Sequence, residues 1–254
     1  MKYYASISYD GSFFKGIAIQ PDQKTIKGVF DFVLSKFFQQ EIKMYLVSRT
    51  DKGVHAMDSR ICFELETKIP VNKLAEVLNP KLENIQINWL QEVSPDFILQ
   101  KQEFSKLYKY QIKLGKTYPF EKNYNWLLDT IEYSHDFLQE ILDAFLGEHD
   151  FRNFCKVDHT RNIINYTRNI QKIYFKKNEN QLIIFIQGNG FLWMMVRYIV
   201  NVIISCMKLM INKSDIKNLL TGATPSKECL KVLRPAPAEG LYLYSTVGTN
   251  ELSL

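Results

Sequence analysis

Hydrophobic and polar residues alternate over residues 2–9, and this period of two predicts a β-strand. After Thr25, whose hydroxyl suits the N-cap position, hydrophobic residues recur at the spacing of one helical face, namely at Ile26, Val29, Phe30, Val33, Leu34, Phe37 and Phe38. Strand patterns follow over 42–47 and 59–65, then a helical pattern over 71–78 and a strand over 85–90. The first part of the chain is therefore predicted to run β-α-β-β-α-β.

The pattern restarts after Pro95. Residues 107–114 alternate as a strand with aromatic and aliphatic side chains on one face and lysines on the other. The elements predicted next are a helix over 137–146 that ends at Gly147, strands over 168–176 and 181–187, a hydrophobic helix from about Phe191, a short helix over 214–220, and a strand over 241–247. The second part thus has the same order with one additional helix, although the two parts share no residue-level repeat.

Two such units in tandem predict an α/β (α+β) fold with two ferredoxin-like, RRM-like subdomains. The boundary is expected within 95–106, so that the subdomains comprise residues 1–104 and 105–254. Ligands bind preferentially where domains meet, and we expect an active-site cleft between the two subdomains.

The run from Phe191 to Ile211 is hydrophobic enough to raise the alternative of a membrane span. Arg197 and Lys208 interrupt it and leave an uninterrupted apolar stretch that is too short to cross a bilayer. A buried core helix is the better interpretation, and we predict no membrane association.

Composition limits the class of protein but does not indicate a specific function. The chain has 254 residues, 46% of them hydrophobic, which is enough for one large or two modest globular domains. The net charge of +5 suits a polyanionic partner without requiring one. The cysteines are scattered (Cys62, Cys155, Cys206 and Cys229), which favours reduced thiols in a cytoplasmic protein. The chain starts directly in a strand pattern, without a signal-peptide core.

The polar stretch from Val47 to Ala56 is the leading candidate for chemistry, because it connects two strand patterns that can hold it rigidly. An ordinary turn is the alternative, since Asp followed by Lys-Gly is common turn chemistry. Asp51 is the leading candidate for a nucleophile or a base, and as a nucleophile it could attack an electrophilic carbon if a guanidinium kept it ionised. Arg49 and Arg197 are the possible partners, and Arg197 needs a carboxylate unless it lies at an exposed helix end.

Lysine, arginine and aromatic residues are interleaved in the second half, as in proteins that stack rings on unpaired bases and hold phosphates with cations. The residues are Lys106, Tyr108, Lys109, Tyr110, Lys113, Lys116 and Tyr118, and further on Phe151, Arg152, Phe154, Lys156, Arg161, Tyr166, Arg168 and Lys172. Any one of these charges could equally be an ordinary solvated side chain.

No metal site is predicted. His149, Asp150, Cys155, Asp158 and His159 cluster, but their spacing fits none of the usual zinc patterns. The sequence also contains no Gly-rich phosphate loop, Gly-x-Ser-x-Gly elbow or zinc-deaminase signature, which argues against nucleotide hydrolysis and serine-based acyl transfer.

The stretch from Ser48 to Ala56 resembles the Gly-Arg-Thr-Asp-Ala-Gly-Val-His-Ala signature of the TruA family of tRNA pseudouridine synthases. The resemblance covers nearly the whole chain, since further motifs occur in the family's order. They are Tyr9 to Ser12, Leu107 to Tyr110, His149 to Phe151, Phe191-Leu192 with Met195 to Arg197, and Ala236 to Leu243.

The resemblance implies a cofactor-free isomerase that converts uridine to pseudouridine at positions 38, 39 and 40 of the tRNA anticodon stem-loop, acting as a homodimer on a flipped-out nucleotide. Matched to the family's motifs, Asp51 is the nucleophile, attacking either C1′ of the ribose or C6 of the uracil. Tyr108 stacks on the base and helps to remove the C5 proton, and Arg197 pairs with Asp51. Arg49 contacts phosphate or fills the space of the flipped nucleotide, and Leu241 forms an apolar wall. The second subdomain would bind tRNA and form the dimer.

The chain departs from the family's pattern at three places. Ser48 and Lys52 replace Gly and Ala beside Asp51, Ile17 stands where Trp is common, and Ile98 to Lys101 replaces a run that usually contains arginine. Two other classes of function remain as alternatives: a tRNA-binding protein without activity, and an Asp-dependent hydrolase of a smaller nucleotide.

Overall fold

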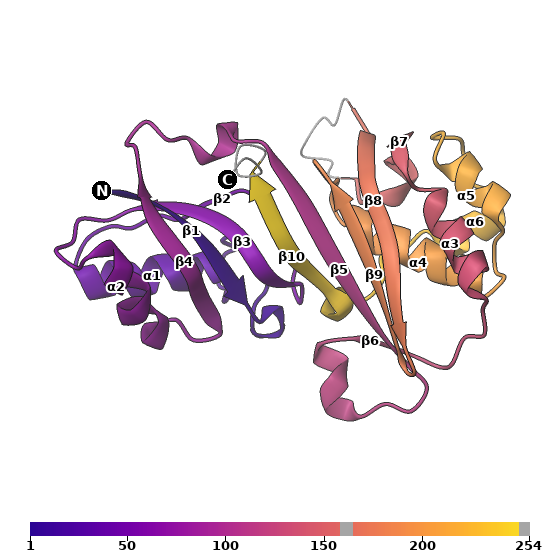
Figure 1. The fold of residues 1–254 in the computed structure, drawn as a ribbon, viewed down its shortest axis with the longest axis horizontal. Helices are drawn as coiled ribbons and strands as arrows, with labels where there is room; N and C mark the ends of the chain where they lie inside the picture. The colour runs from indigo at the N-terminus through magenta and orange to yellow at the C-terminus, as the bar shows by residue number, and fades with distance from the viewer. Residues whose placement is uncertain (158–164, 249–254) are drawn as a thin grey trace. The chain divides into compact units, whose positions relative to one another are not determined.

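The structure is a computed structural model, and it describes residues 1–157 and 165–248 (Figure 1). The chain has a mixed α/β fold and divides into two compact units. Unit 1 comprises Met1–Phe104 together with the C-terminal strand from Tyr242, and unit 2 comprises Ser105–Leu241. Asp158, His159 and Arg161 lie outside the described residues.

In unit 1, β1 (Lys2–Tyr9) lies between β3 (His55–Glu64) and β4 (Ile85–Val93) and is antiparallel to both. The short β2 (Tyr45–Leu46) pairs with β3, and β10 (Leu241–Gly248) runs parallel to β3. The helices are α1 (Ile26–Phe38) and α2 (Val71–Leu78). α1 begins where predicted, because the Thr25 hydroxyl accepts a hydrogen bond from the Gly28 amide.

The core of unit 1 forms where α1 packs on the sheet. Phe30 and Leu34 of α1 are fully buried, and the Phe30 ring meets the Phe63 ring of β3 edge-on, with 5.3 Å between centroids. Tyr3 of β1, which is paired with Phe63 across the two strands, stacks on its ring with 5.5 Å between centroids. These contacts hold the C-terminal end of β3, the strand that begins directly after the polar stretch.

In unit 2 the strand order is β5-β9-β8-β7, with antiparallel neighbours, and β6 pairs parallel to β5. The strands are β5 (Phe104–Leu114), β6 (Trp126–Leu128), β7 (Gly147–Asp150), β8 (Thr167–Asn178) and β9 (Gln181–Gly188). The helices are α3 (His135–Asp143), α4 (Met195–Met207), α5 (Lys213–Leu219) and α6 (Lys227–Val232). Nearly all of α4 is buried, as the core-helix interpretation predicts.

Several predicted boundaries are wrong. β2 has two residues instead of the predicted 42–47, and β3 begins at His55 instead of residue 59. α4 begins at Met195 instead of near Phe191, because residue 194 takes a left-handed backbone conformation (φ 62°). β6, β7 and α6 were not predicted, because they are too short to show a period.

The last strand is a further correction. Residues 241–254 were assigned to the C-terminal subdomain, but β10 pairs with β3 of unit 1, with Tyr242 opposite His55 and Leu243 opposite Ala56. Over the described residues, no helix combines the length and the hydrophobicity needed to span a membrane.

Candidate active site

Asp51 lies in the loop between β2 and β3, in a turn closed by a hydrogen bond from the Val54 amide to the Asp51 carbonyl oxygen (3.2 Å). Gly53 makes this turn with φ of +81°, a conformation that glycine adopts at low cost. The Asp51 side chain is half-buried, whereas Arg49 and Lys52 are exposed. The turn thus presents a carboxylate between two exposed cations.

Thr50, which is buried, anchors the Asp51 loop to neighbouring segments of unit 1. Its hydroxyl lies 2.7 Å from the Tyr9 hydroxyl at the end of β1, and its carbonyl oxygen accepts a hydrogen bond from the Ile17 amide (3.2 Å). Gly16 allows this approach, because a Cβ there would lie 3.1 Å from the same carbonyl oxygen and the residue has φ of +108°. The backbone beside Asp51 is therefore fixed by buried contacts.

The end of the loop is fixed by His55, which is buried. The Gly11 amide donates to His55 Nδ1 (3.1 Å), and Asp10 Oδ1 lies 3.2 Å from the same nitrogen. The imidazole stacks on the Tyr242 ring, with 4.6 Å between centroids. Only glycine fits at position 11, since a Cβ there would lie 2.0 Å from the Val54 carbonyl oxygen. The residues that follow β1 hold the start of β3, and so does strand β10.

Lys52 contributes a like-charged pair rather than a salt bridge. A side-chain hydrogen bond with the neighbouring Lys52 and, next in size, the positive charge of Lys52 lower the pKa of Lys15. Both lysines are exposed. With Arg49, they make the surface around the loop attractive to an anion.

In unit 2, Tyr108 lies on β5, where it is 8% exposed and opposite Ile186 of β9. Its ring meets the Phe191 ring edge-on at 5.1 Å. Tyr110 lies on the same face two residues on and is fully buried. Lys109 and Lys113 are on the other face as predicted, but Lys106 shares the Tyr108 face, and burial lowers its pKa.

Arg197 lies in the first turn of α4 and is tied to Ala236. Its Nε donates to the Ala236 carbonyl oxygen (2.7 Å), and the Ala236 amide donates to the Arg197 carbonyl oxygen (3.1 Å). The side chain is half-buried, at the N-terminal end of the helix. Leu241, at the start of β10, is 5% exposed.

Tyr110 anchors the segment between Ala236 and Leu241. Its hydroxyl donates to the Pro237 carbonyl oxygen (2.7 Å), and its ring leaves no room for a Cβ at Gly240, which would lie 2.8 Å from it. Burial raises the pKa of Tyr110 well above its ordinary value, an effect that Arg197 opposes and Glu239 reinforces. Tyr110 therefore stays neutral and holds the segment that carries the partner of Arg197.

Comparison with known proteins identifies the family. The family model described as tRNA pseudouridine synthase matches residues 5–97 and 141–247. The chain belongs to this family. Proteins named tRNA pseudouridine synthase A are similar over nearly their full length: one from Malacoplasma penetrans is 34% identical over 97% of this chain and 100% of the relative. One from Mycoplasma genitalium is 33% identical over 97% and 98%, and one from Mycoplasmoides gallisepticum is 31% identical over 94% and 88%.

The chain is thus an isomerase of the pseudouridine synthase family that acts on tRNA. Of the site residues expected from the family's motifs, Asp51 and Arg49 lie on one loop of unit 1, and Tyr108, Arg197 and Leu241 lie in unit 2. Sequence reasoning did not single out Thr50 or Tyr9 as supports of this synthase's loop. The only sequence signal for these two residues was that each lies inside a motif of the family, Tyr9 to Ser12 and Ser48 to Ala56.

The departures from the family's pattern have different structural settings. Ile17 is fully buried, so its side chain belongs to the core. Ser48 is also buried, and its hydroxyl has no hydrogen-bond partner among the described residues. In the run from Ile98 to Lys101, Leu99 is buried and the others are exposed, within a short 3-10 helix (Leu99–Lys101).

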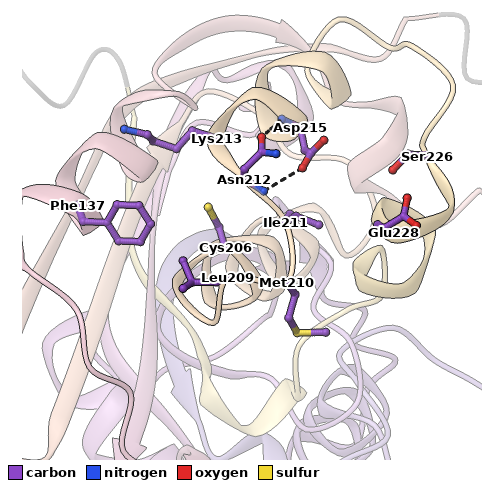
Figure 2. Close-up of a pocket in the computed structure, with 10 residues that line it drawn as sticks. All are labelled: Phe137, Cys206, Leu209, Met210, Ile211, Asn212, Lys213, Asp215, Ser226 and Glu228. Atoms are coloured by element: carbon purple, nitrogen blue, oxygen red, sulfur yellow. Dashed lines mark hydrogen bonds between the residues drawn. The ribbon is translucent and has the colours of Figure 1, made fainter.

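Unit 2 contains a pocket of about 550 Å³ (Figure 2). It lies at the end of α4 and beside α5 and α6, and none of the expected site residues lines it. Its lining residues are Phe137, Cys206, Leu209, Met210, Ile211, Asn212, Lys213, Asp215, Ser226 and Glu228. Within residues 1–157 and 165–248, no three His, Cys, Asp or Glu side chains are grouped so as to hold a metal ion.

Proposed function

We propose that the protein isomerises uridine to pseudouridine at positions 38, 39 and 40 in the anticodon stem-loop of tRNA, as a cytoplasmic homodimer. The match over nearly the whole chain to proteins named tRNA pseudouridine synthase A supports this substrate. The cations around Asp51 and the net charge of +5 suit a polyanionic substrate.

We propose further that the chain consists of two tandem ferredoxin-like subdomains. Unit 1 supports this, because β1 lies between β4 and β3 and β2 pairs with the far side of β3, around two helices. In this proposal the first subdomain carries the Asp51 loop, and the second binds tRNA and forms the dimer.

The reaction breaks the N1–C1′ bond of uridine, forms a C5–C1′ bond, and moves a proton from C5 to N1. Atoms and electrons balance within the substrate, so the protein must supply a nucleophile, a proton acceptor and a closed pocket for the detached base. A base inside a helical stem is out of reach, and the target nucleotide is therefore flipped out of the stack.

The observation that carries the assignment is the anchorage of Asp51. The carboxylate sits on a turn whose neighbours Thr50 and Val54 are buried and hydrogen-bonded, as a nucleophile that must be aimed requires. Attack on C1′ and attack on C6 both place the carboxylate against the flipped uridine.

The remaining roles follow the same proposal. Tyr108 stacks on the uracil and helps to remove the C5 proton, and Leu241 forms an apolar wall. In this proposal Arg197 pairs with Asp51 and aims its carboxylate. Arg49 contacts the phosphate or fills the space that the flipped nucleotide leaves.

The test maps pseudouridine in unmodified tRNA after incubation with the wild-type protein and with Asp51→Asn. We expect modification at positions 38, 39 and 40 with the wild type and none with the variant. Asp96→Asn, which removes an exposed carboxylate elsewhere in unit 1, serves as the matched control. Activity that survives in Asp51→Asn would refute the nucleophile, and wild-type modification elsewhere in tRNA would refute the position.

A further inference from the structure

Tyr118 and Phe120 form a pair of exposed, parallel rings in unit 2. Their centroids are 5.5 Å apart and their planes differ by 4°, which is an offset stack. Phe120 is 72% exposed and Tyr118 is 49% exposed. Single exposed aromatics are common, but two aligned rings in solvent form a flat surface of the kind on which nucleic-acid bases stack. We call these two residues the ring pair.

The segment that carries the ring pair is held in one conformation. It forms a 3-10 helix (Pro119–Asn123) between β5 and β6 (Figure 1). The Tyr118 amide donates to Glu121 Oε2 (2.8 Å), and Lys113 of β5 pairs with Glu121 Oε1 (3.2 Å). The backbone that carries the rings is therefore ordered before any ligand binds, which lowers the entropy cost of binding.

The charge around the ring pair is positive. Lys116 Nζ lies 5.8 Å from the centroid of the Tyr118 ring, and Lys122 is exposed on the 3-10 helix. The one carboxylate in this helix, Glu121, is engaged: its hydrogen bond with the Tyr118 amide and its pairing with Lys113 lower its pKa. Rings for bases and lysines for phosphates are thus combined on one short segment.

The ring-pair segment is also connected to the residues that hold Arg197. It packs against the 3-10 helix Ala238–Gly240, and β6, which follows it, places Trp126 edge-on to Tyr110 at 6.1 Å. Tyr110 in turn donates to Pro237, next to the Arg197 partner Ala236. The ring pair therefore lies beside the segment that supports a proposed active-site residue.

We propose that the ring pair is a stacking platform for an unpaired base of the tRNA anticodon loop, with Lys116 and Lys122 contacting the adjoining phosphates. The identity of this RNA region rests on the proposed function. Stacking on the outer face of Phe120 is independent of base type, because every base has a π-face, so the platform orients the loop without reading its sequence.

The experiment measures binding of a tRNA transcript to the full-length protein and to Phe120→Ala, Tyr118→Ala and Phe120→Trp. Loss of one stacked base weakens binding by about 5- to 150-fold, and we expect this loss for both alanine variants and retention of affinity for the tryptophan variant. Phe32→Ala is the matched control, because Phe32 is 65% exposed and has Lys36 Nζ at 5.8 Å from its ring centroid. Its affinity should match the wild type.

A second readout places 2-aminopurine at unpaired anticodon-loop positions. Its fluorescence should be quenched on binding the wild type and not on binding Phe120→Ala. Wild-type affinity in both alanine variants, or a loss no larger than that of Phe32→Ala, would overturn the platform. A change in oligomeric state with unchanged tRNA affinity would show that a second copy covers the rings, and would also overturn it. If the alanine variants lose affinity but pseudouridine maps outside the anticodon stem, the proposed modification position is refuted. The ring pair is then a stacking platform for a different tRNA loop.

Discussion

The hydroxyl groups of Tyr9 and Thr50 lie 2.7 Å apart in the interior, although the residues are 41 positions apart. This contact joins the end of β1 to the residue before Asp51. Replacing Thr50 with valine keeps the shape and removes the hydroxyl, at a cost of about 1–3 kcal/mol for the loss of a buried hydrogen bond. We expect Thr50→Val to fold, to unfold at lower urea concentration, and to lose kcat because Asp51 is less well aimed.

A double-mutant cycle that combines Thr50→Val with Tyr9→Phe tests whether the two hydroxyl groups act together. If the two hydroxyls act on the loop together, the double variant should lose little more kcat than either single variant. Strictly additive losses in kcat, with each variant folded, would contradict the role of the contact in aiming Asp51.

Gly240 is predicted to be intolerant of any side chain. A Cβ there would lie 2.8 Å from the Gln111 carbonyl oxygen and 2.8 Å from the Tyr110 ring, so Gly240→Ala must displace the start of β10 and Leu241. We expect a loss of about 1–3 kcal/mol in the free energy of unfolding and a rise in KM. Gly190→Ala, where a Cβ would meet only ordinary contacts at 3.8 Å, is the control. Equal stability of the two variants in urea would contradict this prediction.

Asp58 connects β10 to β3 within unit 1. Its carboxylate accepts from the Thr246 amide (2.9 Å), from the Ser6 hydroxyl (2.6 Å) and from Arg60 Nε (2.8 Å). Arg60 is 7% exposed, and its guanidinium lies 4.6 Å from the centroid of the Trp89 ring. Asp58→Ala leaves a buried cation without its carboxylate, and we expect a loss of about 3–5 kcal/mol.

Asp58→Asn keeps the shape and one acceptor oxygen, but it removes the charge and replaces the other oxygen with an NH₂ donor. Its loss should be smaller than that of Asp58→Ala, because one acceptor remains. Chemical denaturation of both variants checks the order. If the Asp58→Ala protein is as stable as the wild type, the hydrogen bond to Tyr4 and the contact with the Trp89 ring are sufficient to stabilise the Arg60 guanidinium.

The parts of the fold that follow from local rules were predicted from the sequence. α1 and α2 have the expected bounds, since the helical period of both and the capping hydroxyl of α1 are local signals. β2 was predicted too long, because strand length depends on the partner, and β3 accepts pairing there only at Tyr45 and Leu46. The pairing of β10 with β3 joins positions about two hundred residues apart, which no local pattern reports.

In the candidate site, too, local features were predicted from the sequence and long-range contacts were not. Asp51 is proposed from a contiguous motif of the family to which the chain belongs. Its supports, Tyr9, Thr50 and Gly16, are far apart in sequence and meet only in the folded unit. Lys106 precedes the 107–114 alternation and therefore had no predicted face, and its even position in β5 places it on the Tyr108 face.

Buried thiols set a limit on stability at high pH. Burial raises the pKa of Cys155 and of Cys206 from 9.0 to about 11. Because the folded-state pKa is raised, this contribution to stability is complete below pH 9 and is lost as pH rises from 9 through 11, where the unfolded chain releases protons that the folded chain retains. Urea unfolding at pH 8 and pH 10.5 should show this loss. The loss should be smaller in Cys206→Ala, and an unchanged pH dependence in that variant would contradict the assignment.

Lys52, which replaces the Ala of the family's motif, is predicted to hold a tRNA phosphate together with Lys15. The two ammonium groups repel each other, as the lowered pKa of Lys15 indicates, and a phosphate between them would relieve this repulsion. One lost phosphate contact reduces the slope of log K against log salt by about 0.7–0.9. We expect this reduction for Lys52→Ala in tRNA binding measured across salt concentrations, with kcat at saturating tRNA retained. Lys68→Ala, which removes another exposed lysine of unit 1, should leave the slope unchanged, and equal slopes for all three proteins would show that Lys52 meets no phosphate.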